Sequence, residues 1–287
     1  MNTAAVQEFP ERIEIELSST CNLNCTYCPR RYVDGLGGFL DPQLFYRMID
    51  EAASYPERIL VLHRRGESLL HPEFIPMLNY CRGKFKEVQL ATNATLMGPS
   101  QAEAILDSLH FISFSIDLPE RFRAVRGGDY EVVKGNIDYL LERNHGLRTQ
   151  VSMVRTEEVN EDEVQRFMDL WRNKVDRVRV YEEHSSEGRF GALKRDRGPR
   201  QSCTMPFYEM VVLSDGKIAR CNHDWDGPPI GDANLAGLAD IWHSPVYQDL
   251  RQQHTTMRIS DATCRECDSW YPERGLQGTG ILQEKQA

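Results

Sequence analysis

The sequence predicts an α/β protein: a partial (β/α)6 barrel, or strongly curved parallel sheet, followed by a small C-terminal α+β domain stabilised by metal ligation. Strand and helix patterns alternate through residues 1–185, as in proteins whose parallel sheet is covered by helices. The residue pattern changes after residue 202, where the chain has few apolar residues to form a core. Seven of the eight cysteines form two groups, one in each region, and such groups favour metal ligation.

Six segments of the first region have the character of strands. The first alternates polar and apolar residues with a period of two, and the others contain short apolar runs. Six strands are too few for a full eightfold barrel, and each crossover between them is expected to be right-handed. The segments are 12–17, 59–62, 87–91, 111–116, 149–154 and 175–181.

Five helical segments lie between these strands. Asp41 and Pro42 are typical of an N-cap followed by proline at the first helical position. The other helices are indicated by apolar side chains that recur at helical spacing. The five segments are 42–49, 72–81, 99–109, 130–141 and 164–171.

The C-terminal region follows a Gly- and Arg-rich linker. We expect a barrel over 1–185, a linker over 186–202, a small domain with the second cysteine group over 203–275 and a poorly ordered tail over 276–287. Within the domain, segments 208–213 and 217–219 flank an Asp-Gly turn and predict a hairpin. One helix is predicted over 238–252.

Composition excludes several classes of function. The formal charge of −9 argues against a nucleic-acid groove, which needs a concentrated positive field. The sequence contains no run of 18 apolar residues, so it predicts no membrane helix, and the N-terminus lacks the features of a signal peptide. We therefore expect a cytoplasmic protein, and in that compartment grouped cysteines indicate metal or redox chemistry rather than structural disulfides.

The first cysteine group, Cys21, Cys25 and Cys28, follows the first strand directly. Three thiolates within eight residues can hold three irons of a cubane and leave the fourth iron open for chemistry. The alternative is a zinc knuckle that lacks one ligand. Tyr27 is an aromatic residue that could lie against a bound purine.

The segment CNLNCTYC resembles the CxxxCxΦC signature of the radical S-adenosylmethionine (SAM) superfamily, where Φ is aromatic. The resemblance extends over the whole partial barrel. It implies a catalytic 4Fe–4S cluster whose open iron is chelated by S-adenosylmethionine, and reductive cleavage to a 5′-deoxyadenosyl radical that abstracts a substrate hydrogen. It also implies a low-potential electron donor such as flavodoxin or ferredoxin.

Further positions resemble the family's cofactor-binding motifs. Gly66 and Glu67 match a GGE motif in which glycine admits the cofactor's methionine part and the acid accepts a bond from its ammonium, although Arg65 replaces the first glycine. The resemblance also assigns cofactor contacts at the ends of later strands. These are Asn93, Ser115, Asp117 and, for the cofactor carboxylate, Arg155.

The second cysteine group supplies four thiolates, from Cys203, Cys221, Cys264 and Cys267. Spacing alone fits a closed cluster and a structural zinc ribbon equally well. The surrounding Gly and Asp-Ile-Trp positions resemble the twitch domain, a shortened SPASM domain with one auxiliary 4Fe–4S cluster. The resemblance therefore implies two 4Fe–4S clusters in all.

The layout resembles aminocyclitol dehydrogenases that oxidise 2-deoxy-scyllo-inosamine, which implies oxidation of a carbinol in a small sugar-like substrate with the auxiliary cluster as electron acceptor. Alternatives are a sugar or nucleoside epimerase, decarboxylase or dehydratase. A peptide maturase is disfavoured because no leader-binding domain fits before residue 11. The non-enzymatic alternative is a zinc-binding interaction protein.

Several residues receive no catalytic role from the sequence. Cys81 is interpreted as a buried helix cysteine rather than a hydrogen-atom donor. His63 and His223 have no assigned role. A set of basic residues is interpreted as solvated loop charge rather than an anion site; it comprises Arg121, Arg123, Arg126, Arg189, Lys194, Arg195, Arg197 and Arg200.

Overall fold

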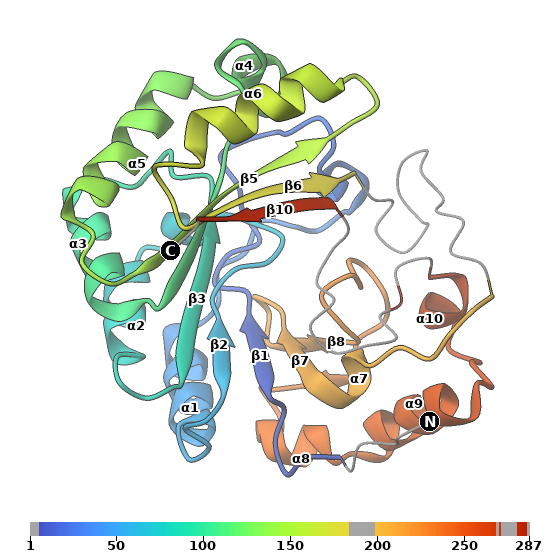
Figure 1. Cartoon of the computed structure of the whole chain (residues 1–287). Helices are drawn as coiled ribbons and strands as arrows, with labels where there is room; N and C mark the ends of the chain where they lie inside the picture. Colours follow the sequence, from blue (N-terminus) through green and yellow to red (C-terminus); the bar gives the residue numbers. More distant parts are fainter. Residues whose placement is uncertain (1–5, 184–198, 268–269, 271–279, 286–287) are drawn as a thin grey trace.

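The computed structural model describes residues 6–183, 199–267, 270 and 280–285, and within them one ten-stranded sheet forms the centre of the molecule (Figure 1). Six neighbouring strands in sequence order run parallel, as predicted. Pairing of Ile13 with Leu60, and of Leu60 with Val88, sets the register of the first three. The strands are β1 (Arg12–Ile15), β2 (Ile59–Val61), β3 (Glu87–Thr92), β4 (Phe111–Ser115), β5 (Arg148–Arg155) and β6 (Arg177–Glu182).

Helices cover the outer, convex face of these strands (Figure 1). The predicted cap of the first helix is present, because Asp41 accepts a hydrogen bond of 2.9 Å from the Leu44 backbone N–H. One helix, α4 (Pro119–Arg126), was not expected. The others are α1 (Pro42–Ala52), α2 (Phe74–Tyr80), α3 (Pro99–Ser108), α5 (Tyr130–Arg143) and α6 (Glu161–Trp171).

The C-terminal region continues the same sheet. Strand β7 (Glu209–Val212) pairs in parallel with β1, and the predicted hairpin joins it to β8 (Lys217–Ala219). A short strand, β9 (Gly231–Asp232), pairs with β8. Tyr208, expected at the start of the hairpin, instead ends the short helix α7 (Met205–Tyr208). Hydrogen bonding between β1 and β7 therefore connects the barrel directly to the region that carries the second cysteine group.

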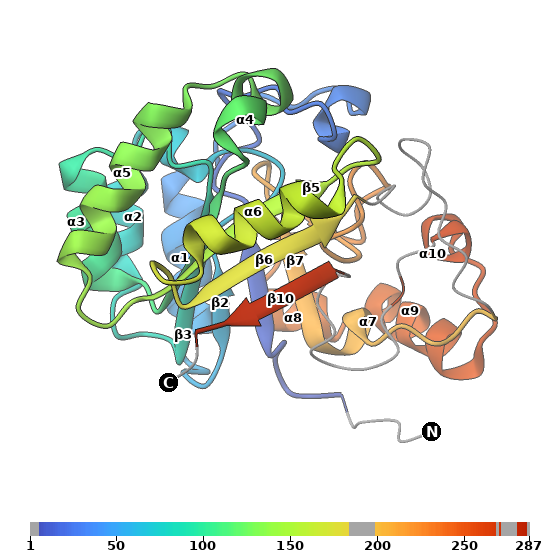
Figure 2. The same ribbon diagram turned by 45° about the horizontal axis from the view of Figure 1, so that its top comes forward.

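Part of the expected poorly ordered tail forms a strand. β10 (Gly280–Glu284) pairs antiparallel with β6, with Leu282 opposite Arg179 (Figure 2). The prediction for 276–287 was wrong over these residues, because the exposed edge of β6 offers unpaired backbone groups that a short extended segment satisfies. The remaining tail residues, except Lys285, lie outside the described part of the chain.

The single helix predicted over 238–252 is also corrected. The structure has α8 (Leu238–Trp242) and α9 (Pro245–Thr256), with Ser244 capping the second helix. Pro245 lacks a backbone N–H and disfavours helical geometry at the preceding residue, so the chain turns there. A last short helix, α10 (Ala262–Glu266), carries Cys264.

Two further predictions concern the linker and membranes. Most of the linker, including Arg189, Lys194, Arg195 and Arg197, lies outside the described residues. Among the residues that are described, no helix is long and apolar enough to cross a membrane.

Candidate functional site

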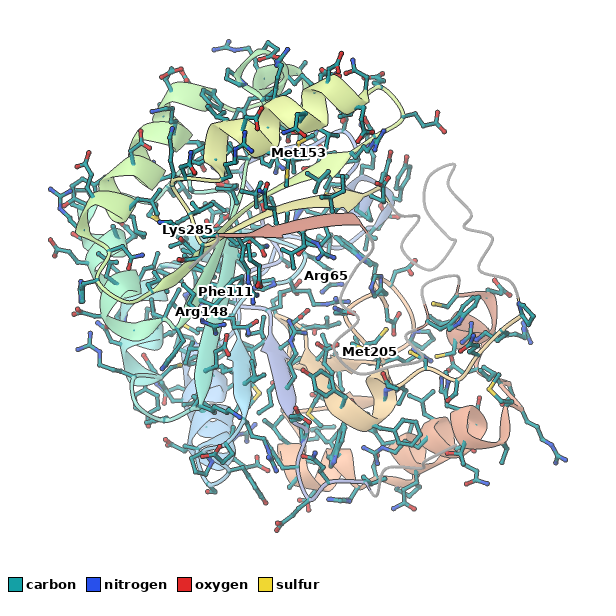
Figure 3. The ribbon with its side chains drawn as sticks, in the orientation of Figure 1. Arg65, Phe111, Arg148, Met153, Met205 and Lys285 are labelled. Atoms are coloured by element: carbon teal, nitrogen blue, oxygen red, sulfur yellow. The ribbon has the colours of Figure 1, made fainter. Side chains whose placement is uncertain are left out.

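A cavity of about 710 Å³ opens on the concave face of the sheet. Cys21, Cys25 and Cys28 line it beyond the carboxyl end of β1. It runs along the sheet as far as Phe111 and Arg148, the first residues of β4 and β5, which lie close together in Figure 3. The cysteine loop and the barrel interior therefore share one continuous space.

Backbone hydrogen bonds hold the cysteine loop in place. The Thr26 N–H donates to the Val125 carbonyl at 2.8 Å, and the Cys28 N–H donates to the Cys25 carbonyl at 3.1 Å. Burial raises the pKa of the Cys28 thiol to about 11. A bound cation would reverse this preference, because metal coordination deprotonates thiols.

Gly66 lines the cavity, and its close approach to a neighbouring loop also requires a glycine. A Cβ at this position would lie 2.3 Å from the Ser18 carbonyl oxygen and 2.4 Å from that of Thr20. The glycine therefore allows the loop after β2 to approach the backbone that leads into Cys21. The Glu67 N–H donates to the same Thr20 carbonyl at 2.8 Å and fixes this contact.

The Glu67 carboxylate is buried, with 3% of its surface exposed, and it accepts three hydrogen bonds from the protein. Its donors are the Leu69 N–H at 3.1 Å, the Thr92 hydroxyl at 2.8 Å and the Asn93 N–H at 2.8 Å. Burial raises the pKa of Glu67, while these bonds lower it. The side chain thus ties the loops after β2 and β3 together, although it also lines the cavity.

Asn93 and Ser115 both line the cavity. The Asn93 amide donates to Asn22 Oδ1 at 3.0 Å and lies 3.9 Å from Cys21 Sγ. Ser115 is the last residue of β4. The structure therefore brings both residues to the same space as the first cysteine group.

Asp117 lies behind the cavity wall, where its Oδ2 accepts a 2.5 Å hydrogen bond from Arg126 Nε. Burial raises the pKa of Asp117, and the charge of Arg126 lowers it. Burial lowers the pKa of Arg126, but its interactions with Tyr27, Asp117 and Cys25 outweigh this effect and raise the pKa. The Arg126 guanidinium lies 5.6 Å from the centre of the Tyr27 ring, and both residues line the cavity. Interpretation of Arg126 as solvated loop charge was wrong, because its side chain is buried against Asp117.

Arg155 is not brought to the cavity. Its guanidinium forms an ion pair of 2.9 Å with Glu161 at the start of α6, and it is absent from the described residues that line the cavity. Val154, its neighbour on β5, lines the cavity instead. Alternation along a strand explains the difference, since successive side chains point to opposite faces.

Polar side chains line the interior of the barrel. Gln150 Nε2 donates to Ser113 Oγ at 2.9 Å, and the Ser113 and Ser152 hydroxyls lie 3.4 Å apart. Branched apolar residues usually fill such an interior. These residues occupy alternate positions on strands that were expected to be buried, and this alternation is the sequence signal for a polar interior.

His63 is another cavity residue that the sequence left without a role. Its Nδ1 accepts a hydrogen bond of 2.9 Å from the Ala91 N–H, so the ring proton must reside on Nε2. Burial first, and then the charges of Arg12 and Arg64, lower the pKa of His63 to about 3. His63 is therefore a neutral hydrogen-bond donor rather than a base.

The second cysteine group lines a separate pocket. Cys203, Cys221, Cys264 and Cys267 meet there with Arg200, Arg220, His223 and His254. Burial raises the pKa of Cys264, and the Cys203 N–H donates to His254 Nδ1 at 3.3 Å. Four thiols beside two arginines suit a cluster whose thiolates give it a net negative charge.

Cys81 lies at the end of α2 within the apolar core, where its thiol donates to the Met77 carbonyl at 3.4 Å. Burial raises its pKa. It is not among the described residues that line the cavity. The position agrees with a structural cysteine.

The chain matches two family models. A model described as the radical SAM superfamily matches residues 15–170, and one described as an iron–sulfur cluster-binding domain (SPASM) matches residues 203–268. The chain is 30% identical over 164 residues to an AdoMet-dependent heme synthase of Methanosarcina barkeri, covering 54% of this chain and 46% of that protein. It spans less than two thirds of the length of the curated relatives that it matches.

Two solved structures share the fold. BtrN in complex with AdoMet and 2-DOIA has a TM-score of 0.62 at 17% identity, with 91% of this chain and 94% of that chain covered. Streptococcus suis SuiB bound to the precursor peptide SuiA has a TM-score of 0.71 at 16% identity, with coverage of 92% and 70%. Both likenesses concern the arrangement of the chain, and they agree with an open barrel followed by a C-terminal cluster-binding domain.

Proposed function

This chain belongs to the radical SAM superfamily, and we propose that it is an oxidoreductase acting on a carbinol of a sugar, an aminocyclitol or a related small natural-product intermediate. When bound, S-adenosylmethionine and a reduced 4Fe–4S cluster supply the 5′-deoxyadenosyl radical that removes the carbinol hydrogen. A low-potential protein such as flavodoxin or ferredoxin provides the electron. The family membership leaves the zinc-binding interaction protein without support.

One observation carries the proposed oxidation: the loop that follows Cys221 forms part of the cavity wall. Trp225 lines the cavity together with Cys21, and Arg65 donates to the Trp225 carbonyl at 2.8 Å. A substrate radical in the cavity becomes a ketone when it loses its hydroxyl proton to solvent and one electron. The adjacent second cluster is suited to accept that electron.

We assign the cluster ligands by the same geometry. Cys21, Cys25 and Cys28 hold the first cluster and leave one iron for S-adenosylmethionine. Four cysteines surround the second pocket and close the second cluster, so it transfers electrons without binding substrate; they are Cys203, Cys221, Cys264 and Cys267.

The cofactor contacts are assigned to side chains on the cavity wall. Tyr27, Asn93 and Ser115 face the space beside the first cysteine group. Glu67 also lines the cavity and fixes the Asn93 backbone, whereas Asp117 lies behind the wall and fixes Arg126. This arrangement excludes Arg155 from our assignment of the site.

The polar barrel interior supports the substrate class. Ser113, Gln150 and Ser152 offer hydroxyl and amide groups, and His63 offers an N–H whose partner nitrogen is already bonded. Sites of this kind bind hydroxylated ligands and reject apolar analogues, which would leave the polar groups unpaired.

A second candidate is modification of a peptide. It is favoured by the likeness to SuiB bound to its precursor peptide, which has the higher TM-score of the two structures compared above. A peptide would have to enter the same cavity, where β10 occupies the edge of β6.

The reconstituted protein should be incubated anaerobically with S-adenosylmethionine, a reductant and a panel of carbinol-deuterated sugars and aminocyclitols. The proposal expects deuterium in 5′-deoxyadenosine and a ketone product from at least one member. Deuterium transfer only from peptides would support the second candidate and contradict the first.

A further inference from the structure

We propose that Arg64 and Arg65 are positioning residues. They hold the loop after Cys221 against the loop after β2, and they thereby set the reduction potential of the second cluster. The inference rests on the proposed ligation of that cluster by the four C-terminal cysteines. Arg65 occupies the place of the first glycine in the motif that this segment resembles, so this arginine is a departure of the chain from that motif.

Arg64 binds the loop through both terminal nitrogens. Nη1 donates to the Asn222 carbonyl and Nη2 donates to the Asp224 carbonyl. Only 2% of its side chain is exposed, and Glu14 balances its charge at 3.6 Å. The two carbonyls belong to the turn that directly follows Cys221, which the Asp224 N–H closes by donating to the Cys221 carbonyl at 3.1 Å.

Arg65 binds the same loop one residue further on, from a position near the centre of the molecule (Figure 3). Its Nη1 donates to the Trp225 carbonyl at 2.8 Å. Nε and Nη2 each donate to the Glu16 carboxylate at 2.8 Å, which is a bidentate pair. Glu16 also accepts from the Ser214 N–H at 3.0 Å, so the network reaches the hairpin turn.

Glu209 of β7 anchors the other side of the turn. It accepts from the Asn222 N–H at 3.3 Å and forms an ion pair with Arg12 of β1. The turn after Cys221 is thus held by three arginine–carbonyl bonds and one glutamate–amide bond. All of the charged partners are buried or nearly so, and each arginine has a carboxylate beside it.

This arrangement affects the cluster in two ways. In a trans peptide group the N–H and the C=O point in opposite directions. Arginines that bind the carbonyls therefore fix the direction of the peptide dipoles next to Cys221. Hydrogen bonds, dipoles and charge around the cysteine sulfurs set the potential of an iron–sulfur cluster. Loss of either arginine also removes a buried positive charge, which stands beside Glu14 or Glu16, and this makes addition of an electron less favourable.

The test compares Arg64→Met and Arg65→Met with Arg121→Met. Arg121 is a matched control, because it is also largely buried in ion pairs but lies on α4 and contacts Glu158 and Glu163. In the full-length chain with Cys21, Cys25 and Cys28 replaced by alanine, a redox titration followed by EPR reports the second cluster alone. We expect both test variants to lower its equilibrium constant for reduction at least tenfold, which is 59 mV for one electron, and the control to leave it unchanged.

Arg64→Lys and Arg65→Lys cover the case in which a methionine variant does not fold. Each keeps the charge but loses the fork that binds two groups at once, so a smaller fall in the same direction is expected. An unchanged potential in cluster-loaded lysine or methionine variants would overturn the proposal and leave the arginines a purely structural role. The ratio of oxidised product to 5′-deoxyadenosine in the holoenzyme tests the acceptor role separately.

Discussion

The Glu67 carboxylate accepts a 2.8 Å hydrogen bond from the backbone N–H of Asn93 and so joins the loops that follow β2 and β3. Both oxygens of this side chain are in use, Oε2 by Asn93 and Oε1 by Leu69 and Thr92. A residue assigned from resemblance as a direct cofactor ligand is thus first a support for the loop that carries Asn93.

Glu67→Gln tests this support. An amide can offer only one accepting oxygen, so its NH2 would face a donor that the carboxylate now satisfies, at a cost of about 1–3 kcal/mol. We expect the thermal midpoint to fall by roughly 2–12 °C for a domain of this size, and S-adenosylmethionine to bind more weakly. Glu73→Gln, at an exposed position before α2, is the control. Unchanged stability and affinity would contradict the support role.

Asp117→Asn breaks the buried ion pair with Arg126. Removal of one partner leaves a buried charge, which costs about 3–5 kcal/mol. Thermal unfolding under anaerobic conditions should therefore show a clearly lower midpoint than wild type. The double variant Asp117→Leu/Arg126→Met should recover most of the loss, since no charge is then stranded. Equal instability of the single and double variants would argue against the pair as the cause.

Cluster content checks the two cysteine groups. The reconstituted protein should contain about eight irons and eight sulfides, from two 4Fe–4S clusters. Replacement of Cys21, Cys25 and Cys28 by alanine should leave about four irons and abolish cleavage of S-adenosylmethionine. Cys81→Ala is the matched control and should retain both clusters, because Cys81 lies in the apolar core. Stoichiometric zinc without sulfide would be incompatible with the assignment.

The double variant Cys264→Ala/Cys267→Ala addresses the electron acceptor. It should still cleave S-adenosylmethionine but form little oxidised product, because the substrate radical has lost the cluster that takes its electron. In heavy water, wild type should fix no solvent deuterium at the reacting carbon. One deuterium there would indicate epimerisation, and the hydrogen donor would then have to be a residue other than Cys81, which does not line the described cavity.

His63 predicts a dependence of stability on pH. Its folded pKa of about 3 lies well below the usual histidine value of 6.5, so below pH 6.5 the unfolded chain binds a proton that the folded chain does not. Stability is therefore lost as the pH falls, by up to about 1.4 kcal/mol per pH unit. His63→Gln removes this contribution while its amide keeps an acceptor for Ala91 and a donor for the cavity. Denaturant titrations between pH 5 and 7 should show a shallower decline for the variant, and parallel curves would count against a neutral His63.

Local sequence patterns were sufficient to predict most of the strands and helices and to identify the cysteine groups. Alternating and helical periodicities identified all six barrel strands and five of the six barrel helices, because burial on one face repeats every two or 3.6 residues. The missed helix, α4, is short and half of its residues are charged, with Phe122 and Val125 as its buried apolar residues. The sequence also identified the cysteines of CNLNCTYC as a ligand group, because all three lie within one loop.

The amino-acid sequence by itself determined the α/β architecture, the two groups of thiols and the polar residues at the strand ends. Only the tertiary structure decided which charges are buried and what they hold: Arg126 against Asp117, and Arg65 between Glu16 and the Trp225 carbonyl. It also decided that β10 pairs with β6. The contacts of Arg65 and of β10 join residues far apart in the chain. A guanidinium also has the same local sequence pattern whether water or a buried carboxylate satisfies it.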